Sequence, residues 1–103
     1  MAYTAKVELV WDYAKNNVNL KKHGVSFEEA GVLFTSGADY LEIFDEFHSN
    51  TEDRFVAIGP ITRGLILVVY TEVVEDTVRI ISARRATKRE RLIYEAYLKE
   101  HER

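Results

Sequence analysis

The sequence predicts an α+β domain in which helices flank a small, mainly antiparallel sheet, in the order β-α-α-β-β-β-β-α. Three observations lead to this fold class. Apolar residues recur at helical spacing near both ends of the chain. Between residues 39 and 84 the pattern changes to four short apolar runs that polar turns separate. Because the links between these runs are short, antiparallel hairpins are favoured.

The chain is expected to begin with a strand and a helix. Residues 6–11 (KVELVW) alternate between apolar and polar positions, as a strand does. Asp12 suits the N-cap of a helix that runs from Tyr13 to about Lys22. Gly24 can adopt the left-handed conformation that commonly ends a helix.

A second helix follows directly. Ser26 and Glu29 have the spacing of a capping box, in which each side chain bonds the backbone of the other residue. The expected apolar stripe of this helix consists of Phe27, Ala30, Leu33 and Phe34.

Four strands and a third helix complete the fold. The strands are expected at residues 39–44, 54–61, 64–72 and 77–84. The segment LILVVY within the third of these is apolar on both faces, which places it in the middle of the sheet. Thr87 and Glu90 form another capping box, at the start of a C-terminal helix. Its expected apolar face consists of Leu92, Ile93, Ala96 and Tyr97.

Bulk composition narrows the class of protein. A chain of 103 residues with 47% apolar and 30% charged residues is expected to form one soluble domain, spanning residues 1–103. Cysteine is absent, so neither disulfides nor thiolate chemistry are possible. We see no signal peptide and no apolar run long enough for a membrane span, and we therefore expect a cytoplasmic protein.

The most unusual feature is a basic segment in an acidic protein. Residues 79–91 (RIISARRATKRER) hold six of the fourteen Lys and Arg residues, opposed only by Glu90. The segment carries +5 and the rest of the chain −8, for a net charge of −3. Arginine binds phosphate oxygens through a bidentate fork, so a phosphodiester is one expected ligand. The alternative is a solvated face that pairs with acidic residues elsewhere on the surface.

Strand alternation would divide the first part of this segment between two faces. It places Arg79, Ile81, Ala83 and Arg85 on one face and Val78, Ile80, Ser82 and Arg84 on the other. Lys88 and Arg89 then fall on the first turn of the C-terminal helix. Cations oppose the dipole at a helix N-terminus, which a purely structural design would avoid.

Two other groups of residues could carry chemistry. Asn16, Asn19 and His23 share one helix face, with Lys22 beside them. For the two asparagines we favour a role in anchoring nearby backbone over contact with a ligand. His23 stays a candidate for proton transfer, because both of its charge states are accessible near pH 7.

The second group lies in the polar turn at residues 45–54 (DEFHSNTEDR). Asp45, His48 and Glu52 could suggest a metal site, but their spacing matches no familiar metal motif, and we expect no metal or cofactor. Glu52 and Arg54 would share a face if the strand already begins at Glu52, which could combine acid–base and phosphate-binding roles. The structural alternative is a surface salt bridge. No phosphate-binding loop, dinucleotide fingerprint or nucleophile elbow is present, which argues against nucleotide-hydrolysing and redox enzymes.

Taken together, four segments resemble the BrnT family of bacterial type II toxins. They are WDYAKNNVNLKKHGVSFEEA, HSNTEDRFVAIG, VVYTE and RIISARRATKRER followed by IYE, and they extend over residues 10–95. The resemblance implies a RelE-like fold and a metal-independent ribonuclease that inhibits translation. It also implies a BrnA-like antitoxin with a ribbon-helix-helix domain, whose complex with the toxin binds operator DNA. The sequence departs from the family at Val73 and Glu75, where a basic residue is common.

RNA cleavage through the 2′-hydroxyl requires a base, an acid and cations around the phosphate. We predict that arginines and lysines hold the phosphate and that His23 and Glu52 transfer protons, with Tyr94 as a distant reserve. The residues expected to act in catalysis are His23, Glu52, Arg54, Arg79, Arg84 and Arg85, and those expected to bind substrate are Lys22, Lys88 and Arg89. The alternative hypothesis is a non-catalytic, degenerate module that only binds an antitoxin or nucleic acid.

Overall fold

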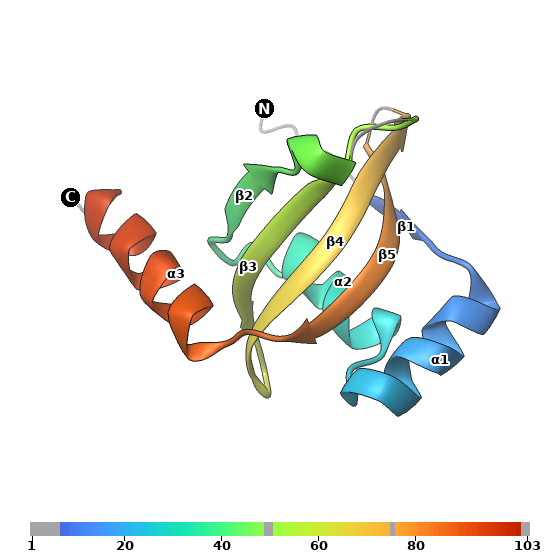
Figure 1. Ribbon diagram of the computed structural model, residues 1–103, viewed down its shortest axis with the longest axis horizontal. Coiled ribbons are helices and arrows are strands. Elements are labelled where there is room, and N and C mark those ends of the chain that lie inside the picture. Colours follow the sequence, from blue (N-terminus) through green and yellow to red (C-terminus); the bar gives the residue numbers. More distant parts are fainter. Residues whose placement is uncertain (1–6, 49–50, 75, 102–103) are drawn as a thin grey trace, which may run out of the picture.

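The structure, a computed structural model, describes residues 7–48, 51–74 and 76–101. These residues form a five-stranded sheet, three α-helices and one short 3-10 helix, η1 (Figure 1). In chain order the elements are β1 (Glu8–Val10), α1 (Tyr13–His23), α2 (Phe27–Thr35), β2 (Leu41–Phe44), η1 (Glu46–His48), β3 (Phe55–Ile61), β4 (Gly64–Val74), β5 (Thr77–Arg85) and α3 (Lys88–Glu100).

The sheet is mixed, with the strand order β1-β5-β4-β3-β2. Strands β2 to β5 pair antiparallel through successive hairpins, whereas the short β1 pairs parallel to β5. The strand that contains LILVVY is β4, and it lies at the centre of the sheet as predicted. The predicted α+β class and the order of elements are confirmed.

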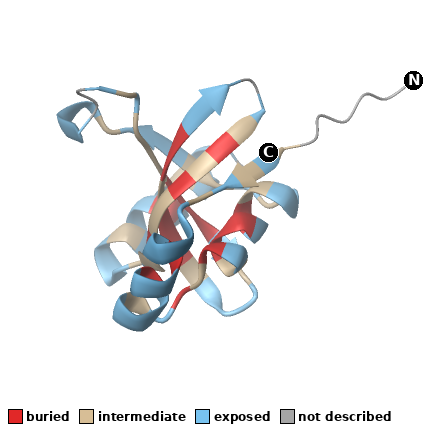
Figure 2. Cartoon of the chain, turned by 90° about the vertical axis from the view of Figure 1, so that its right-hand side faces the viewer, coloured by how far each residue is buried: buried red, intermediate tan, exposed pale blue. Residues whose placement is uncertain are grey.

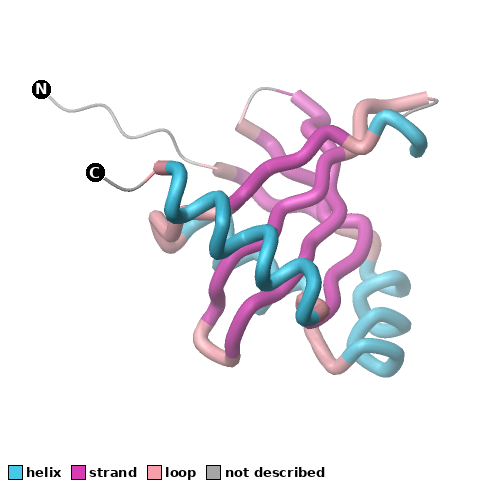
Figure 3. The backbone as a smooth tube through the Cα atoms, turned by 60° about the vertical axis from the view of Figure 1, so that its left-hand side comes forward, coloured by secondary structure: helices cyan, strands magenta, loops and turns pink. Residues whose placement is uncertain are grey.

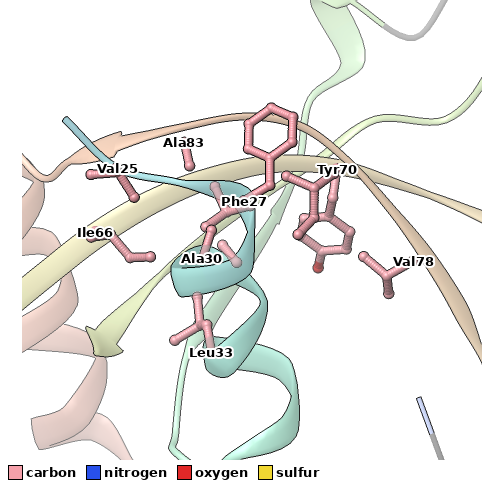
Figure 4. Packing of buried hydrophobic residues seen from close by; sticks show 11 residues of the cluster. Val25, Phe27, Ala30, Leu33, Ile66, Tyr70, Val78 and Ala83 are labelled. Atoms are coloured by element: carbon pink, nitrogen blue, oxygen red, sulfur yellow. The ribbon is translucent and has the colours of Figure 1, made fainter. Parts of the chain in front are cut away.

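Helices cover both faces of the sheet. The tube view shows α3 crossing one face, while α1 and α2 lie behind the other (Figure 3). The larger core cluster joins α2 to β3, β4 and β5, with Phe27, Ala30 and Leu33 pointing toward the strands (Figure 4). A smaller cluster beneath α3 consists of Ile58, Leu67 and Tyr94. Buried residues therefore occur along the strands, while the outer sides of the helices are exposed (Figure 2).

The predicted caps define the helix starts. The Asp12 side chain accepts a hydrogen bond from the Lys15 backbone N–H at 3.0 Å. Both capping boxes form in full, at Ser26 and at Thr87. Gly24 ends α1 with a φ of 73°, a conformation that costs other residues more than it costs glycine.

The prediction of the two faces of β5 is wrong beyond Ile80. Tyr70 of β4 pairs with Ile80, but its neighbour Val69 pairs with Ser82, so Ile81 is an extra residue in the strand. Such a bulge breaks the alternation of side chains by one position. Ala83 consequently enters the core beside Ile80 instead of sharing a face with Arg79.

The predicted apolar face of α3 is correct at Tyr97 but wrong at Leu92 and Ile93. Tyr94 is its buried residue, and Tyr97 packs against the same cluster, while the side chains of Leu92 and Ile93 stay exposed. The Tyr94 hydroxyl donates to the Asp39 carbonyl oxygen at 2.7 Å. A tyrosine can bury its ring here because its polar end has a partner.

Among the described residues, no helix combines the length and the apolar character that a membrane span needs.

Candidate active site

Two buried asparagines hold helix α1 in place, Asn19 by bonds to β5 and Asn16 by bonds to α2. The Asn19 amide nitrogen donates to the carbonyl oxygens of Val25 and Ala83, both at 2.8 Å, and its oxygen accepts from the Ala83 N–H at 3.1 Å. The Asn16 oxygen accepts from the Phe27 N–H at 2.8 Å, so it caps the start of α2. The predicted anchoring role of both asparagines is confirmed.

Between this anchor and β1, the edge of β5 has no neighbouring strand among the described residues. Strand β1 pairs with β5 only from Thr77 to Arg79, and Asn19 reaches the strand again at Ala83. Figure 1 shows α1 beside this edge, below β1. A groove with two adjoining cavities lies along it.

The first of these, the polar cavity, has a volume of about 190 Å³. Glu52 and Arg54 reach it from the segment before β3, and Arg79 reaches it from β5. The Arg79 guanidinium donates to the Glu52 carboxylate at 2.5 Å. The residues that line the polar cavity are Asp12, Lys15, Glu52, Arg54, Arg79, Ile80 and Ile81.

The ion pair in the polar cavity is accessible to a competing anion. The side chains of Arg79 and Glu52 are 42% and 33% exposed, so water screens their attraction. Pairs of this kind contribute no more than about 1 kcal/mol. A phosphate could therefore take the place of the carboxylate at Arg79 at little cost, which would leave Glu52 free to accept a proton.

The second, apolar cavity continues the groove along α1 and has a volume of about 320 Å³. It shares Lys15 and Ile81 with the polar cavity. Its lining residues are Ala14, Lys15, Val18, Asn19, Lys22, His23, Ile81 and Ser82. The predicted residues Lys22 and His23 thus belong to the same groove as Glu52, Arg54 and Arg79.

His23 and Glu52 lie in different parts of the groove. His23 is the last residue of α1, whereas Lys15, near the start of the helix, lines the cavity that contains Glu52. At 1.5 Å per residue, the eight steps from Lys15 to His23 span about 12 Å along the helix axis. His23 and Glu52 therefore line different cavities of the groove, and their pairing in proton transfer stays a prediction.

The remaining cations of the basic segment lie outside the groove. Arg84, Arg85, Lys88 and Arg89 line neither cavity. Arg84 and Arg85 follow Arg79 by five and six positions in an extended strand, so their Cα atoms lie roughly 15 to 20 Å from that of Arg79. The predicted cluster is therefore split between the two ends of β5. Arg85, Lys88 and Arg89 are exposed at the end nearer α3.

Arg84 is held by its own helix cap. Its guanidinium donates two hydrogen bonds of 2.8 Å to the Glu90 carboxylate, which also accepts from the Thr87 N–H. These bonds lower the pKa of Glu90 to about 2 and raise the pKa of Arg84. The cations at the N-terminus of α3 are thus partly offset by a carboxylate in the first turn.

The acidic and histidine side chains of the polar turn at residues 45–54 also do not gather at one site. His48 Nδ1 and Asp45 Oδ2 lie 2.8 Å apart, whereas Glu52 turns toward Arg79. Across the described ranges, no three His, Asp or Glu side chains gather closely enough to hold a metal ion. Ser49 and Asn50 of this turn, and Glu75 of the family departure, lie outside the described residues. Val73, at the end of β4, is half-exposed and lines neither cavity.

Sequence reasoning missed Lys15, which lines both cavities. A signal was available, because Lys15, Asn19 and Lys22 follow the i, i+4, i+7 spacing of one helix face. Tyr94, the reserve candidate, is buried beneath α3 and takes no part in the groove.

Comparison with known proteins identifies the family. The model of the BrnT family, described as ribonuclease toxins of type II toxin–antitoxin systems, matches residues 11–90. The chain belongs to the BrnT family. Its fold is similar to the 1.1 Å crystal structure of the Brucella abortus ribonuclease toxin BrnT, with 25% sequence identity and a TM-score of 0.60. That similarity covers 81% of this chain and 100% of the Brucella chain. No match was found among curated proteins.

The BrnT match includes every residue that lines the groove. The two cavities are formed by residues 12–23, 52–54 and 79–82, all within the matched range 11–90. Most of α3 lies beyond that range. A ribonuclease toxin of a type II system acts on RNA and has an antitoxin partner, so the groove and the basic end of β5 are the surfaces to consider for both.

Proposed function

We propose that this BrnT-family chain is a metal-independent endoribonuclease whose cleaved phosphate binds in the polar cavity. The observation that carries the proposal is the Glu52–Arg79 pair, which places a carboxylate and a guanidinium 2.5 Å apart in a cavity that also contains Arg54 and Lys15. Three cations around one space suit a phosphodiester, whose charge grows in the transition state. A carboxylate among them can serve as a base.

The proposed reaction is an internal transfer of the phosphate. Glu52 takes the proton of the ribose 2′-hydroxyl while the 2′-oxygen attacks phosphorus. The bond from phosphorus to the 5′-oxygen breaks, and the products are a 2′,3′-cyclic phosphate and a free 5′-hydroxyl. Arg79 and Arg54 stabilise the negative charge on the phosphate oxygens.

Lys15 gives the leaving oxygen its proton. An ammonium group is far more acidic than the alcohol that the departing 5′-oxygen becomes. Exchange with water then returns Glu52 and Lys15 to their starting states. Each step uses a residue that lines the polar cavity.

The biological setting follows from the family. Cleavage of cellular RNA would inhibit translation, and we propose that the antitoxin is BrnA-like, with a ribbon-helix-helix domain that carries the complex to operator DNA. Copurification of the chain with the product of the neighbouring open reading frame, followed by a DNA-binding assay, tests this part separately from catalysis.

The catalytic proposal is tested with purified protein, RNA and an excess of chelator. Glu52→Gln should lower kcat by about 10² to 10⁴, the range for loss of a general base, with little change in KM. Arg79→Ala should lower kcat/KM by a similar factor, because it loses a charge-assisted contact to the phosphate. The matched controls are Glu95→Gln and Arg91→Ala, which replace exposed residues of α3 outside both cavities.

Two results would contradict the proposal. One is full cleavage by Glu52→Gln while the protein stays folded. The other is cleavage of an RNA in which 2′-deoxy sugars replace the ribose at every cut position, because that RNA lacks the nucleophile. Binding without cleavage that weakens steeply with salt would instead support the non-catalytic module.

A further inference from the structure

We propose that the apolar cavity is a nucleobase subsite, which holds the base of a nucleotide next to the phosphate in the polar cavity. The inference rests on the proposed ribonuclease function and adds the part of the substrate that is recognised beyond the backbone. It assigns a role to a surface that the proposed chemistry does not use.

Continuity of the groove is the first argument. Lys15 and Ile81 line both cavities, so the space around Arg79 adjoins the space around Val18. A ligand with its phosphate at Arg79 has its neighbouring atoms at Lys15. From there the groove runs along α1 toward His23, about 12 Å away along the helix axis.

The chemistry of the walls is the second argument. Ala14, Val18 and Ile81 present apolar surface, and Val18 is 63% exposed although it lies on the side of α1 that faces β5. A flat, apolar base face can cover such a surface and remove it from water. Lys22 and His23, at the far end, can then contact the next phosphate of the chain. Aspartate and glutamate are absent from the residues that line this cavity.

The hydrogen bonds predict weak base preference. Both amide protons of Asn19 already bind the carbonyl oxygens of Val25 and Ala83, so this side chain has no donor left to read a base edge. Ser82 and His23 are the other polar groups, besides the lysines, that line the cavity. Recognition should therefore depend more on apolar contact than on base identity.

The test measures binding of a five-nucleotide RNA in which every ribose carries a 2′-O-methyl group, so that cleavage is blocked. In a parallel series one base is removed at each position in turn. Wild-type protein should lose roughly three- to tenfold in affinity at one position next to the bound phosphate, as expected from uncovering part of an apolar face. Val18→Glu should bind the intact and the abasic RNA equally. Val74→Glu is the control, because Val74 is 64% exposed and lines neither cavity.

Three other outcomes overturn the assignment. If Val18→Glu still distinguishes intact from abasic RNA, the base lies elsewhere, and if wild-type protein does not distinguish them, no base is bound. If Val18→Glu changes only the capture of the antitoxin, the groove is an edge for a protein strand. A wild-type protein that binds the base but cuts no RNA would contradict the proposed catalysis and leave the subsite standing.

Discussion

The clamp between Arg84 and Glu90 allows a stability prediction that can be worked from the structure. Glu90 has a pKa of about 2 in the folded protein, against 4.5 for a free glutamate, chiefly because Arg84 donates two hydrogen bonds to it. A shift of that size would correspond to about 3 kcal/mol if nothing screened the pair. Because the Arg84 side chain is 38% exposed, solvent reduces this contribution. We expect Arg84→Met to lower the free energy of unfolding by about 1 to 2 kcal/mol.

The pH dependence gives the sharper test. The pKa of Glu90 is lower in the folded state than in the unfolded state, so its contribution is complete above about pH 4.5 and is lost as the pH falls toward 2. In Arg84→Met the pKa of Glu90 should return toward 4.5. The difference in stability between wild type and variant should therefore be full at pH 6 and shrink toward pH 2.5.

Urea denaturation at several pH values measures this difference, and thermal unfolding should show a melting temperature about 5 to 10 °C lower near neutral pH. Arg91→Met is the control for loss of an exposed arginine, and Glu90→Gln completes a double-mutant cycle. A difference below about 0.3 kcal/mol, or one that stays constant from pH 6 to 2.5, would refute the reasoning. RNA cleavage by Arg84→Met, measured well below its melting temperature, decides whether this residue also has the predicted catalytic role.

The other predictions concern the packing that holds the groove. Asn19→Ala should cost about 2 to 4 kcal/mol, because it leaves buried backbone groups of Ala83 unpaired, and chemical denaturation checks this. A loss below 1 kcal/mol would mean that water replaces the amide. Gly59→Ala should cost about 1 to 3 kcal/mol, because its new Cβ would lie 2.7 Å from the Cβ of Tyr40. Gly31→Ala should cost less, because the one atom too close to its Cβ would be the Cδ1 at the end of the flexible Leu9 side chain. Equal melting temperatures for the two variants would contradict this.

Local signals explain why so much of the fold could be predicted. A capping box is complete within four residues, so the starts of α2 and α3 needed no knowledge of the rest of the chain. The central position of β4 followed from apolar residues on both of its faces, since only a strand covered on both sides can bury them. The resemblance to BrnT likewise rested on contiguous segments that can be compared directly.

The errors arose where distant segments meet. The bulge at Ile81 depends on how β5 aligns with β4, and nothing in the alternation of β5 itself indicates an extra residue. On α3, Leu92 and Ile93 had a pattern as favourable as that of Tyr94, which is the residue that is buried. The carbonyl of Asp39, which accepts the Tyr94 hydroxyl, comes from a segment 55 residues away.

The candidate site was also predicted only in part from the sequence. Residue type alone indicated that Glu52, Arg54 and Arg79 could serve phosphate chemistry, and the structure brings these three into one cavity. The basic segment that drew attention to Arg79 does not stay together, because an extended strand carries Arg79 and Arg84 roughly 15 Å apart. The carboxylate of Glu90 then binds Arg84 through its own helix cap.

The sequence by itself therefore determined the element order, the caps, the central strand and the family, because each depends on neighbouring residues or on contiguous motifs. The tertiary structure alone decided which cations share a space. Side chains distant in sequence lie together because of the register of the sheet and because Asn19 anchors α1 to the edge of β5. A groove of this kind is a property of that packing, and no single segment of the chain encodes it.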